Sequence, residues 1–251
     1  MDKAQSNKQQ TVYGIRPVIE AIESGKQIDK ILIQNGLSGS LINELRTKIK
    51  EARLTFQFVP IEKLNRTVRG ANHQGVVALI SAIEYQSVYD IVPKLFDEGR
   101  TPTLLMLDRV TDVRNLGAIA RTAECTGVDA IIVPAHGSAQ INEDAIKTSS
   151  GALLRIPVCR EDNLKTVVNY AKQSGLQVCA ATEKGSRPYT EVDFTLPTLL
   201  IMGAEETGIS NDLLKISDVR AKLPILGEVQ SLNVSVAAGV FMYEILRQRG
   251  M

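Results

Sequence analysis

The stretch Leu199–Ser210, with the sequence LLIMGAEETGIS, decides how the second half of this chain folds. Four apolar residues end at Gly203, and two carboxylates and a second glycine follow. An apolar run that stops at a glycine indicates a buried strand entering a loop. In a parallel sheet such a junction lies at the carboxyl edge, where open α/β folds bind ligands. We therefore expect Gly203 to let a ligand approach the backbone closely.

From Thr103 onward, apolar strand patterns alternate with helical patterns on both sides of this stretch. The alternation predicts a mostly parallel α/β sheet with helices on both faces. The predicted strands are Thr103–Leu107, Ala130–Val133, Arg155–Val158, Gln177–Ala181, Thr198–Met202 and Ala221–Leu223. The predicted helices are Leu116–Thr126, Glu143–Ser149, Asn163–Ser174, Asn211–Lys215 and Asn233–Gln248.

A smaller α/β pattern precedes this one. It comprises a helix over Pro17–Ser24, a strand over Asp29–Gln34, a helix that Ser38 or Ser40 caps and that runs to about Ala52, and strands over Leu54–Val59 and Gly75–Ala82. A helix over Val88–Phe96 then leads into a turn-rich segment. We therefore expect a tail at residues 1–10, a first domain at 11–85, a linker at 86–102 and a second domain at 103–251.

The composition, with 44% hydrophobic and 23% charged residues, is that of an ordinary globular protein. No run approaches the length of about 18 apolar residues that a transmembrane helix needs. The polar residues 1–10 lack the apolar core of a secretory signal. Three cysteines without CxxC spacing indicate buried free thiols in a reducing cytoplasm, and with only two histidines we expect no metal site.

The net charge of +1 is unevenly distributed along the chain. Residues 1–85 hold 12 Lys/Arg against 8 Asp/Glu, a balance of +4, whereas residues 86–251 hold 17 against 20, a balance of −3. Solvated helix faces would explain the split. The alternative is that the N-terminal part contacts the phosphates of a nucleic acid.

Several enzyme classes lack their motifs in this chain. There is no GxGxxG fingerprint, no GxSxG elbow and no HExxH. Gly203–Gly208 has the glycine spacing of a P-loop, but Ile209-Ser210 follows where a lysine must reach the phosphates. We therefore exclude nucleotide hydrolysis by a P-loop.

Polar residues gather at two helix starts of the second domain. Asn115 stands before an apolar helix, where its side chain can cap free backbone N–H groups, and Arg121 follows within that helix. Ser231, Asn233 and Ser235 open the last helix, and they exceed what capping alone requires. Each feature by itself is compatible with a purely structural role.

Taken together, these motifs resemble the SpoU (TrmH-like) branch of the SPOUT methyltransferases, in order and spacing. The N-terminal part also resembles the substrate-binding domain of that family, and the closest similarity is to the subgroup that methylates a guanosine ribose of large-subunit ribosomal RNA. The segments that carry the resemblance are Tyr13-Gly14, His73–Ala78, Asn115–Ile119 with Arg121, Thr148–Val158, Gly203–Glu205, Leu223-Pro224 and Ser231–Ser235.

The resemblance implies an RNA ribose 2′-O-methyltransferase that uses S-adenosylmethionine and acts as a cytoplasmic homodimer. The second domain would be a SPOUT fold with a deep trefoil knot, which connection rules alone would not predict. The first would be a ribosomal-protein-like RNA-binding domain. The residues that would hold the methyl donor, largely through backbone groups, are Thr182, Gly203, Leu223, Ile225 and Leu232.

By the same resemblance Arg121 is the candidate that activates the ribose 2′-hydroxyl, while Asn115, Glu205, Ser231 and Asn233 position substrate and loops. An arginine is a poor general base, because a guanidinium stays protonated near neutral pH. Either Arg121 is strongly desolvated, or it anchors an RNA phosphate while another group takes the proton. The family often has Pro-His where this chain has Val113-Arg114, so Arg114 is a candidate for altered substrate choice.

Three other functions compete with an rRNA methyltransferase. They are a tRNA 2′-O-methyltransferase, an RNA-binding relative without activity, and an unrelated α/β nucleotide-dependent enzyme.

Overall fold

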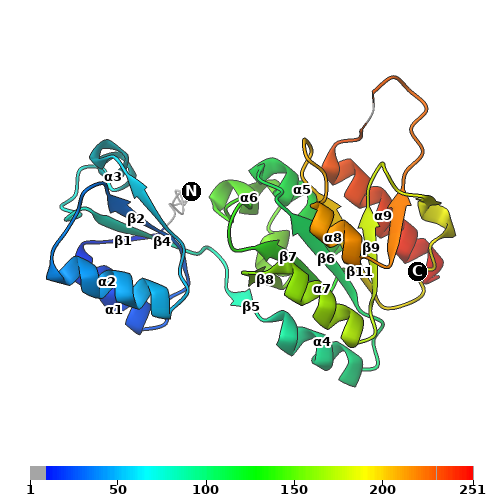
Figure 1. Cartoon of the computed structure of the whole chain (residues 1–251), viewed down its shortest axis with the longest axis horizontal. Coiled ribbons are helices and arrows are strands. Elements are labelled where there is room, and N and C mark those ends of the chain that lie inside the picture. Colours follow the sequence, from blue (N-terminus) through cyan, green and yellow to red (C-terminus); the bar gives the residue numbers. More distant parts are fainter. Residues whose placement is uncertain (1–9, 230, 251) are drawn as a thin grey trace, which may run out of the picture. The chain divides into compact units, whose positions relative to one another are not determined.

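The computed structural model describes residues 10–229 and 231–250, so the predicted tail at 1–10 lies, apart from Gln10, outside the described residues. The chain divides into two compact units. The first comprises the described residues up to Glu84 together with Ile141–Glu143, and the second comprises Tyr85–Gln140 and the described residues from Asp144 onward. Figure 1 shows both units.

The first unit is a four-stranded sheet with helices on both faces. The strand order is β1-β4-β2-β3, in which β2 and β3 are parallel and the other neighbours are antiparallel. The elements are β1 (Thr11–Tyr13), α1 (Ile15–Glu23), β2 (Ile28–Gln34), α2 (Ser40–Glu51), β3 (Phe56–Val59), α3 (Ile61–Thr67) and β4 (Val76–Ile80).

Strand alternation gives this sheet two apolar faces. Ile31 and Ile33 of β2 pack with α1 and α2, whereas Leu32 between them packs with Leu64 of α3. The sequence did not predict β1 or α3. Strand β1 has three residues, and α3 buries Leu64 alone, so neither element carries enough apolar residues to show a period.

The second unit is an eight-stranded sheet in which every strand pairing among the described residues is parallel. The strand order is β10-β12-β9-β11-β6-β7-β8-β5. The strands are β5 (Tyr85–Gln86), β6 (Thr103–Asp108), β7 (Ala130–Pro134), β8 (Val158–Glu161), β9 (Gln177–Ala181), β10 (Arg187–Pro188), β11 (Thr198–Gly203) and β12 (Val219–Lys222). The α-helices are α4 (Val88–Asp97), α5 (Val113–Cys125), α6 (Glu143–Thr148), α7 (Leu164–Gln173), α8 (Asn211–Ile216) and α9 (Val234–Gln248).

Helices cover both faces of this sheet, as the strand–helix alternation predicts (Figure 1). Helices α4, α7 and α8 bury their apolar sides against one face, where Leu104, Met106 and Ile201 are among the strand residues of the core. Helices α5 and α9 pack against each other, and α9 also contacts β11. The central strands β6 and β11 are fully buried, which explains why they read as continuous apolar runs.

The segment expected to be a linker, residues 86–102, contains helix α4. Val88, Val92 and Leu95 of α4 are buried in the core of the second unit. The sequence predicted the helix. The pattern of an amphipathic helix, however, does not reveal which domain will cover its apolar face.

Strand β8 was predicted at Arg155–Val158, and this position is wrong by three residues, because the strand spans Val158–Glu161. A 3₁₀ turn at Ala152–Leu154 precedes it, and Pro157 has no N–H to donate to a ladder. The Pro157 carbonyl accepts from the Ile131 amide at 2.9 Å, and the strand begins directly after it.

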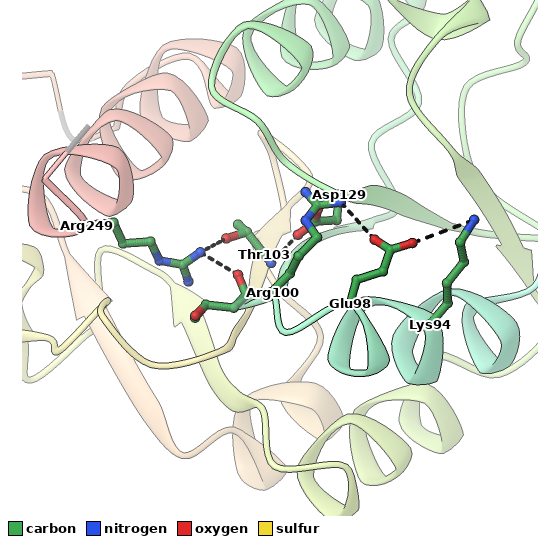
Figure 2. A network of polar contacts seen from close by, with 7 residues as sticks. Lys94, Glu98, Arg100, Thr103, Asp129 and Arg249 are labelled. Atoms are coloured by element: carbon green, nitrogen blue, oxygen red, sulfur yellow. Dashed lines mark hydrogen bonds and ion pairs between the residues drawn. The ribbon is translucent and has the colours of Figure 1, made fainter.

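A polar network closes the amino end of the second sheet, opposite the edge at which Gly203 lies (Figure 2). Asp129 accepts from the Thr103 amide at 2.7 Å and pairs with Arg100. Arg249, directly after α9, donates to the Thr101 carbonyl at 2.8 Å and to the Thr103 hydroxyl at 2.7 Å. The network therefore fastens the end of the last helix to the start of the central strand.

The expectation that all three cysteines are buried is wrong for one of them. All three thiols are free, and Cys159 and Cys179 are buried in the core, but Cys125 is exposed at the end of α5. Burial raises the pKa of both core thiols to about 12. Among the described residues, no helix is both long enough and apolar enough to cross a membrane.

Candidate functional site

A cavity of about 320 Å³ lies at the carboxyl edge of the second sheet. It is formed by the loops that follow β9, β11 and β12 and by one face of α9. All five residues predicted to hold the methyl donor line it, and so do two of the predicted catalytic residues. The seven residues are Thr182, Gly203, Glu205, Leu223, Ile225, Ser231 and Leu232.

The parallel register explains why residues so far apart in sequence meet here. Strand β11 pairs with β9 and with β6, and β9 pairs with β12, all in the same direction. Their carboxyl ends therefore reach one edge, where the loops that follow them converge. The cavity walls combine the side chains of Leu223, Ile225, Leu232 and Phe241 with the carboxylates of the neighbouring loops.

Asn233 joins two other predicted catalytic residues by hydrogen bonds. Its Nδ2 donates to Oδ1 of Asn115 at 3.0 Å and to Oε1 of Glu205 at 2.5 Å. Three segments, the first turn of α5, the loop after β11 and the start of α9, therefore meet at one amide group. Asn115 and Asn233 do not line the cavity themselves, but Glu205 does, so this cluster lies beside the cavity.

The expected role of Asn115 as a helix cap is wrong, because Asp112 caps α5. Oδ1 of Asp112 accepts from the Asn115 amide at 2.8 Å, and Asn115 lies within the first turn of the helix. The side chain of Asn115 is thereby left to accept from Asn233. The capping signal was present in the sequence, since Asp112 stands three residues before Asn115 and aspartate is a preferred cap.

Asn233 is itself the N-cap of α9. Its Oδ1 accepts from the Ser235 amide at 2.9 Å and from the Ser235 hydroxyl at 2.5 Å. The two ends of one amide thus serve different purposes: the oxygen caps the helix, and the nitrogen bridges to Asn115 and Glu205.

Arg121 is not brought to this cluster. It lies six residues beyond Asn115 on α5, about 9 Å along the helix axis, and it does not line the cavity. Its side chain is exposed, and it has no ion pair with any residue in 10–229 or 231–250. Its neighbour Thr122 lines a separate groove between α5 and α9.

Asp108 and Arg109 hold the loop after β11, a role that the sequence did not predict for either residue. Asp108, buried at the end of β6, accepts from the Ser210 amide at 2.6 Å and pairs with Arg109 at 3.2 Å. Arg109 donates to the Gly208 carbonyl at 3.2 Å, and its φ of 61° is unusual for a residue with a side chain. The one available signal was an Asp-Arg pair at the carboxyl end of a strand.

Gly203 is required by the chain itself. A Cβ at this position would lie 2.2 Å from both the Gly208 carbonyl carbon and the Ile209 amide nitrogen. The loop returns on itself here, with the Gly208 amide donating to the Ala204 carbonyl at 2.8 Å. The close approach of the loop's own backbone is therefore enough to explain why a glycine stands at position 203, without any ligand.

The residues around the cavity fit S-adenosylmethionine in chemistry and size. The molecule carries a sulfonium and an ammonium against one carboxylate, and Glu183, Glu205 and Glu206 outnumber Lys184 among the charged lining residues. The apolar lining residues suit an adenine ring, and the volume lies in the range of about 300–1,000 Å³ of small-molecule sites.

A parallel sheet with a ligand cavity at its carboxyl edge places the second unit among the open α/β ligand-binding domains. The model of the SpoU rRNA Methylase family matches residues 102–243, and that of RNA 2′-O ribose methyltransferase substrate binding matches residues 11–86. The chain belongs to the SpoU methylase family, within the SPOUT class of RNA methyltransferases. Its cofactor is S-adenosylmethionine.

Relatives and solved structures agree with this family over nearly the whole chain. A protein of Staphylococcus epidermidis named as a TrmH family tRNA/rRNA methyltransferase is 36% identical over 95% of this chain and 95% of its own length. The SpoU methyltransferase AviRb of Streptomyces viridochromogenes, in complex with S-adenosylmethionine, has a TM-score of 0.60 at 26% identity and covers 95% of this chain and 90% of its own. An S-adenosylmethionine-bound rRNA methyltransferase of Sinorhizobium meliloti gives 0.61 at 26%, covering 94% and 86%. The predicted SPOUT fold class is therefore confirmed, and the trefoil knot stays a prediction.

Proposed function

We propose that this protein transfers a methyl group from S-adenosylmethionine to a ribose 2′-hydroxyl of ribosomal RNA. The observation that carries the proposal is the hydrogen-bonded cluster of Asn115, Asn233 and Glu205 beside the donor cavity. A cavity that only stored a ligand would not need three distant segments joined at its side by one amide. A cluster that positions a second substrate would need them.

When bound, the donor would supply an electrophilic methyl group on its sulfonium sulfur. Its transfer would break the S–C bond, form the bond to the ribose 2′-oxygen, leave a neutral thioether and release the hydroxyl proton to solvent. The task of the protein is to align the hydroxyl with the methyl group. In this proposal Glu205, which lines the cavity and accepts from Asn233, positions the ribose side, and Ser231 borders the same space. Thr182, Gly203, Leu223, Ile225 and Leu232 hold the donor.

Arg121 serves RNA rather than the donor in this account. Its exposed guanidinium, outside the cavity and without a carboxylate partner among the described residues, suits an RNA phosphate. Arg121→Ala should therefore abolish methyl transfer while leaving donor affinity and the melting temperature near parental values. Transfer at close to the parental rate would remove Arg121 from the mechanism.

Ribosomal RNA is favoured over transfer RNA because the first unit is present. The rRNA methyltransferase of S. meliloti covers 94% of this chain, whereas a structure titled for 2-OH methylation of C/U34 on tRNA covers 59%. The test is incubation with donor carrying a labelled methyl group and with purified large-subunit rRNA or tRNA. We expect label in the rRNA. Label in tRNA alone would support the tRNA alternative, and donor binding without any labelled RNA would support an inactive relative.

We further propose that the protein acts as a homodimer through the groove between α5 and α9. Val236, Val240 and Tyr243 lie on one side of α9 at helical spacing and are exposed there, facing a groove that also includes Ala118 and Thr122 of α5. Val240→Glu should convert a dimer into a monomer in sedimentation velocity. A parental protein that sediments as a monomer at all concentrations would overturn this assignment.

A further inference from the structure

Two phenylalanines stand exposed on the edge strand of the first unit. Phe56 and Phe58 of β3 are 46% and 44% exposed, although the chain has only five phenylalanines and no tryptophan. Their rings contact each other edge to face, with centroids 5.5 Å apart at 90°. Since burying an aromatic ring is favourable, a pair left at the surface indicates a site where another molecule covers it.

The strand register explains how both rings reach the same face. Phe56 pairs with Ile31 and Phe58 with Ile33, and both isoleucines point toward helices α1 and α2. Strand β3 is the last strand on this side of the sheet, so α2 covers the rings only in part. The guanidinium of Arg46, on α2, lies 5.4 Å from the centroid of the Phe58 ring.

Helix α2 separates its charges between two sides. Lys48 pairs with Glu23 of α1 at 2.9 Å and with Glu51 at 4.0 Å, and the Glu23 carboxylate raises the pKa of Lys48. Arg46 and Lys50, one turn apart, share the opposite side of the helix. Neither has an ion pair with any residue in the described part of the chain.

The spacing of these two cations along α2 matches the spacing of the two rings along β3. Four residues of a helix advance about 6 Å and two residues of a strand about 6.6 Å. Because β2 and β3 are parallel and α2 connects them, α2 runs back antiparallel to β3. With Arg46 over Phe58, this spacing leads us to expect Lys50 near the level of Phe56. The two cations thus form a row beside the two rings, at matched spacing along this edge.

We propose that Phe56, Phe58, Arg46 and Lys50, named here the β3 surface, bind unpaired bases of a single-stranded segment of the RNA substrate. This inference rests on the proposed RNA methyltransferase function. Exposed aromatic rings and the flat guanidinium stack on splayed bases, and the cations meet the phosphates between them. An apolar protein partner would cover the rings but would offer no negative charge to the two cations. A single-stranded RNA offers flat bases to the rings and phosphates to the cations.

The test uses the full-length protein and a fluorescein-labelled single-stranded RNA of mixed sequence, beside a duplex of the same sequence. Phe56→Leu/Phe58→Leu keeps apolar side chains but removes the stacking faces. It should weaken single-strand binding roughly tenfold and leave duplex binding unchanged. Phe96→Leu, at another half-exposed phenylalanine on α4, is the matched control and should change neither. Lys50→Gln should reduce the salt dependence of single-strand binding by about one phosphate contact.

A 2-aminopurine in the single strand reports stacking directly. Its fluorescence should change on binding to the parent and to Phe96→Leu, but much less with the double variant. Equal single-strand affinity and equal fluorescence for parent and double variant would overturn the inference. Loss of self-association in the double variant, with RNA affinity unchanged, would assign the β3 surface to a protein contact instead and would also overturn it.

Methyl transfer separates this outcome from failure of the proposed function. If the parent methylates RNA and the double variant does so with an unchanged KM, the β3 surface does not bind the RNA substrate, and the methyltransferase assignment stands. If the parent neither methylates nor binds any RNA, the proposed function fails and the β3 surface fails with it. The expected result is a raised KM for RNA, with kcat and donor affinity near parental values.

Discussion

At the residue scale, Asn233 makes two different kinds of contact with one amide group. Its oxygen caps α9, and its nitrogen connects Asn115 to Glu205. The sequence marked Asn233 as a capping residue with more polar neighbours than a cap requires. It could not show the partner, because Asn115 is 118 positions away and only the fold brings the two together.

Two substitutions separate these roles. Asn233→Ala removes the cap and the bridge, so the free energy of unfolding should fall by about 1 kcal/mol. Asn233→Ser keeps a capping oxygen for the Ser235 amide but loses the Nδ2 donor, so it should unfold near the parental denaturant midpoint. Both should lower methyl transfer about a hundredfold through misplacement of Asn115 and Glu205. Near-parental transfer by Asn233→Ser would show that the bridge is dispensable.

Asp129 gives the chain a stability contribution with a defined pH dependence. Burial raises its pKa, against the opposing effects of the Thr103 amide and Arg100. A group with a raised pKa in the folded state binds its proton more tightly there than in the unfolded chain. Its contribution is therefore fully present below the ordinary aspartate pKa of about 3.9 and is lost as pH rises through the folded value.

Melting temperatures of the parent and of Asp129→Asn, measured against pH where both are folded, isolate this contribution. The difference in favour of the parent should be largest at the acid end and should shrink as pH rises above about 4. A difference that grows with pH would mean that the pairing with Arg100 outweighs burial.

At the scale of elements, the loop after β11 is held at both ends by the chain itself. Gly203 lets the loop return against its own backbone, and Asp108 of β6 fixes Ser210 at the far end. The apolar strand and its two glycines could be predicted from Leu199–Ser210 alone. The support from Asp108 could not, because parallel pairing of β6 with β11 is a property of the assembled sheet.

Gly203→Ala should open this loop. The added Cβ meets backbone atoms at 2.2 Å, which a side-chain rotation cannot relieve, so we expect a loss of roughly 1–3 kcal/mol in the free energy of unfolding. Donor affinity, measured by calorimetry, should fall with it. Gly227→Ala is the matched control, since a Cβ there meets nothing within 4 Å. Unchanged donor affinity in Gly203→Ala would separate the loop from the donor site.

The length of an element decides whether the sequence could predict it. Strands β1, β5 and β10 have two or three residues each, too few for a period of two to appear. Long elements with a buried stripe, such as α7 and α9, were predicted within one residue at each end. Two cavity-lining residues, Leu223 and Ile225, follow the end of β12, and family resemblance rather than physical pattern pointed to them.

At the scale of the whole molecule, the proposed function assigns donor binding and RNA binding to different units. The second unit contains the cavity proposed for the donor and the Asn233 cluster, and the first has the positive charge balance and the β3 surface. The sequence predicted two α/β parts. It did not show that α4 belongs to the second unit, because the burial of Val88 and Val92 depends on the sheet that covers them.

Truncation tests this division. A fragment of residues 85–251 keeps β5 and α4, so it should melt cooperatively and bind S-adenosylmethionine, but it should not methylate RNA. A fragment of residues 103–251 lacks Val88, Val92 and Leu95 of the core and should be unfolded or aggregated. Equal stability of the two fragments would show that α4 is only a linker, and RNA turnover by 85–251 would remove the first unit from substrate binding.

The most direct test of the central claim is the position of the transferred methyl group on the RNA. RNA labelled by the enzyme from methyl-labelled donor is digested with alkali, which cleaves the chain only where a free 2′-hydroxyl attacks the neighbouring phosphate. A methyl group on the 2′-oxygen blocks that attack, so we expect label in an alkali-resistant dinucleotide. Label recovered entirely in mononucleotides would place the methyl group on a base and would contradict the account.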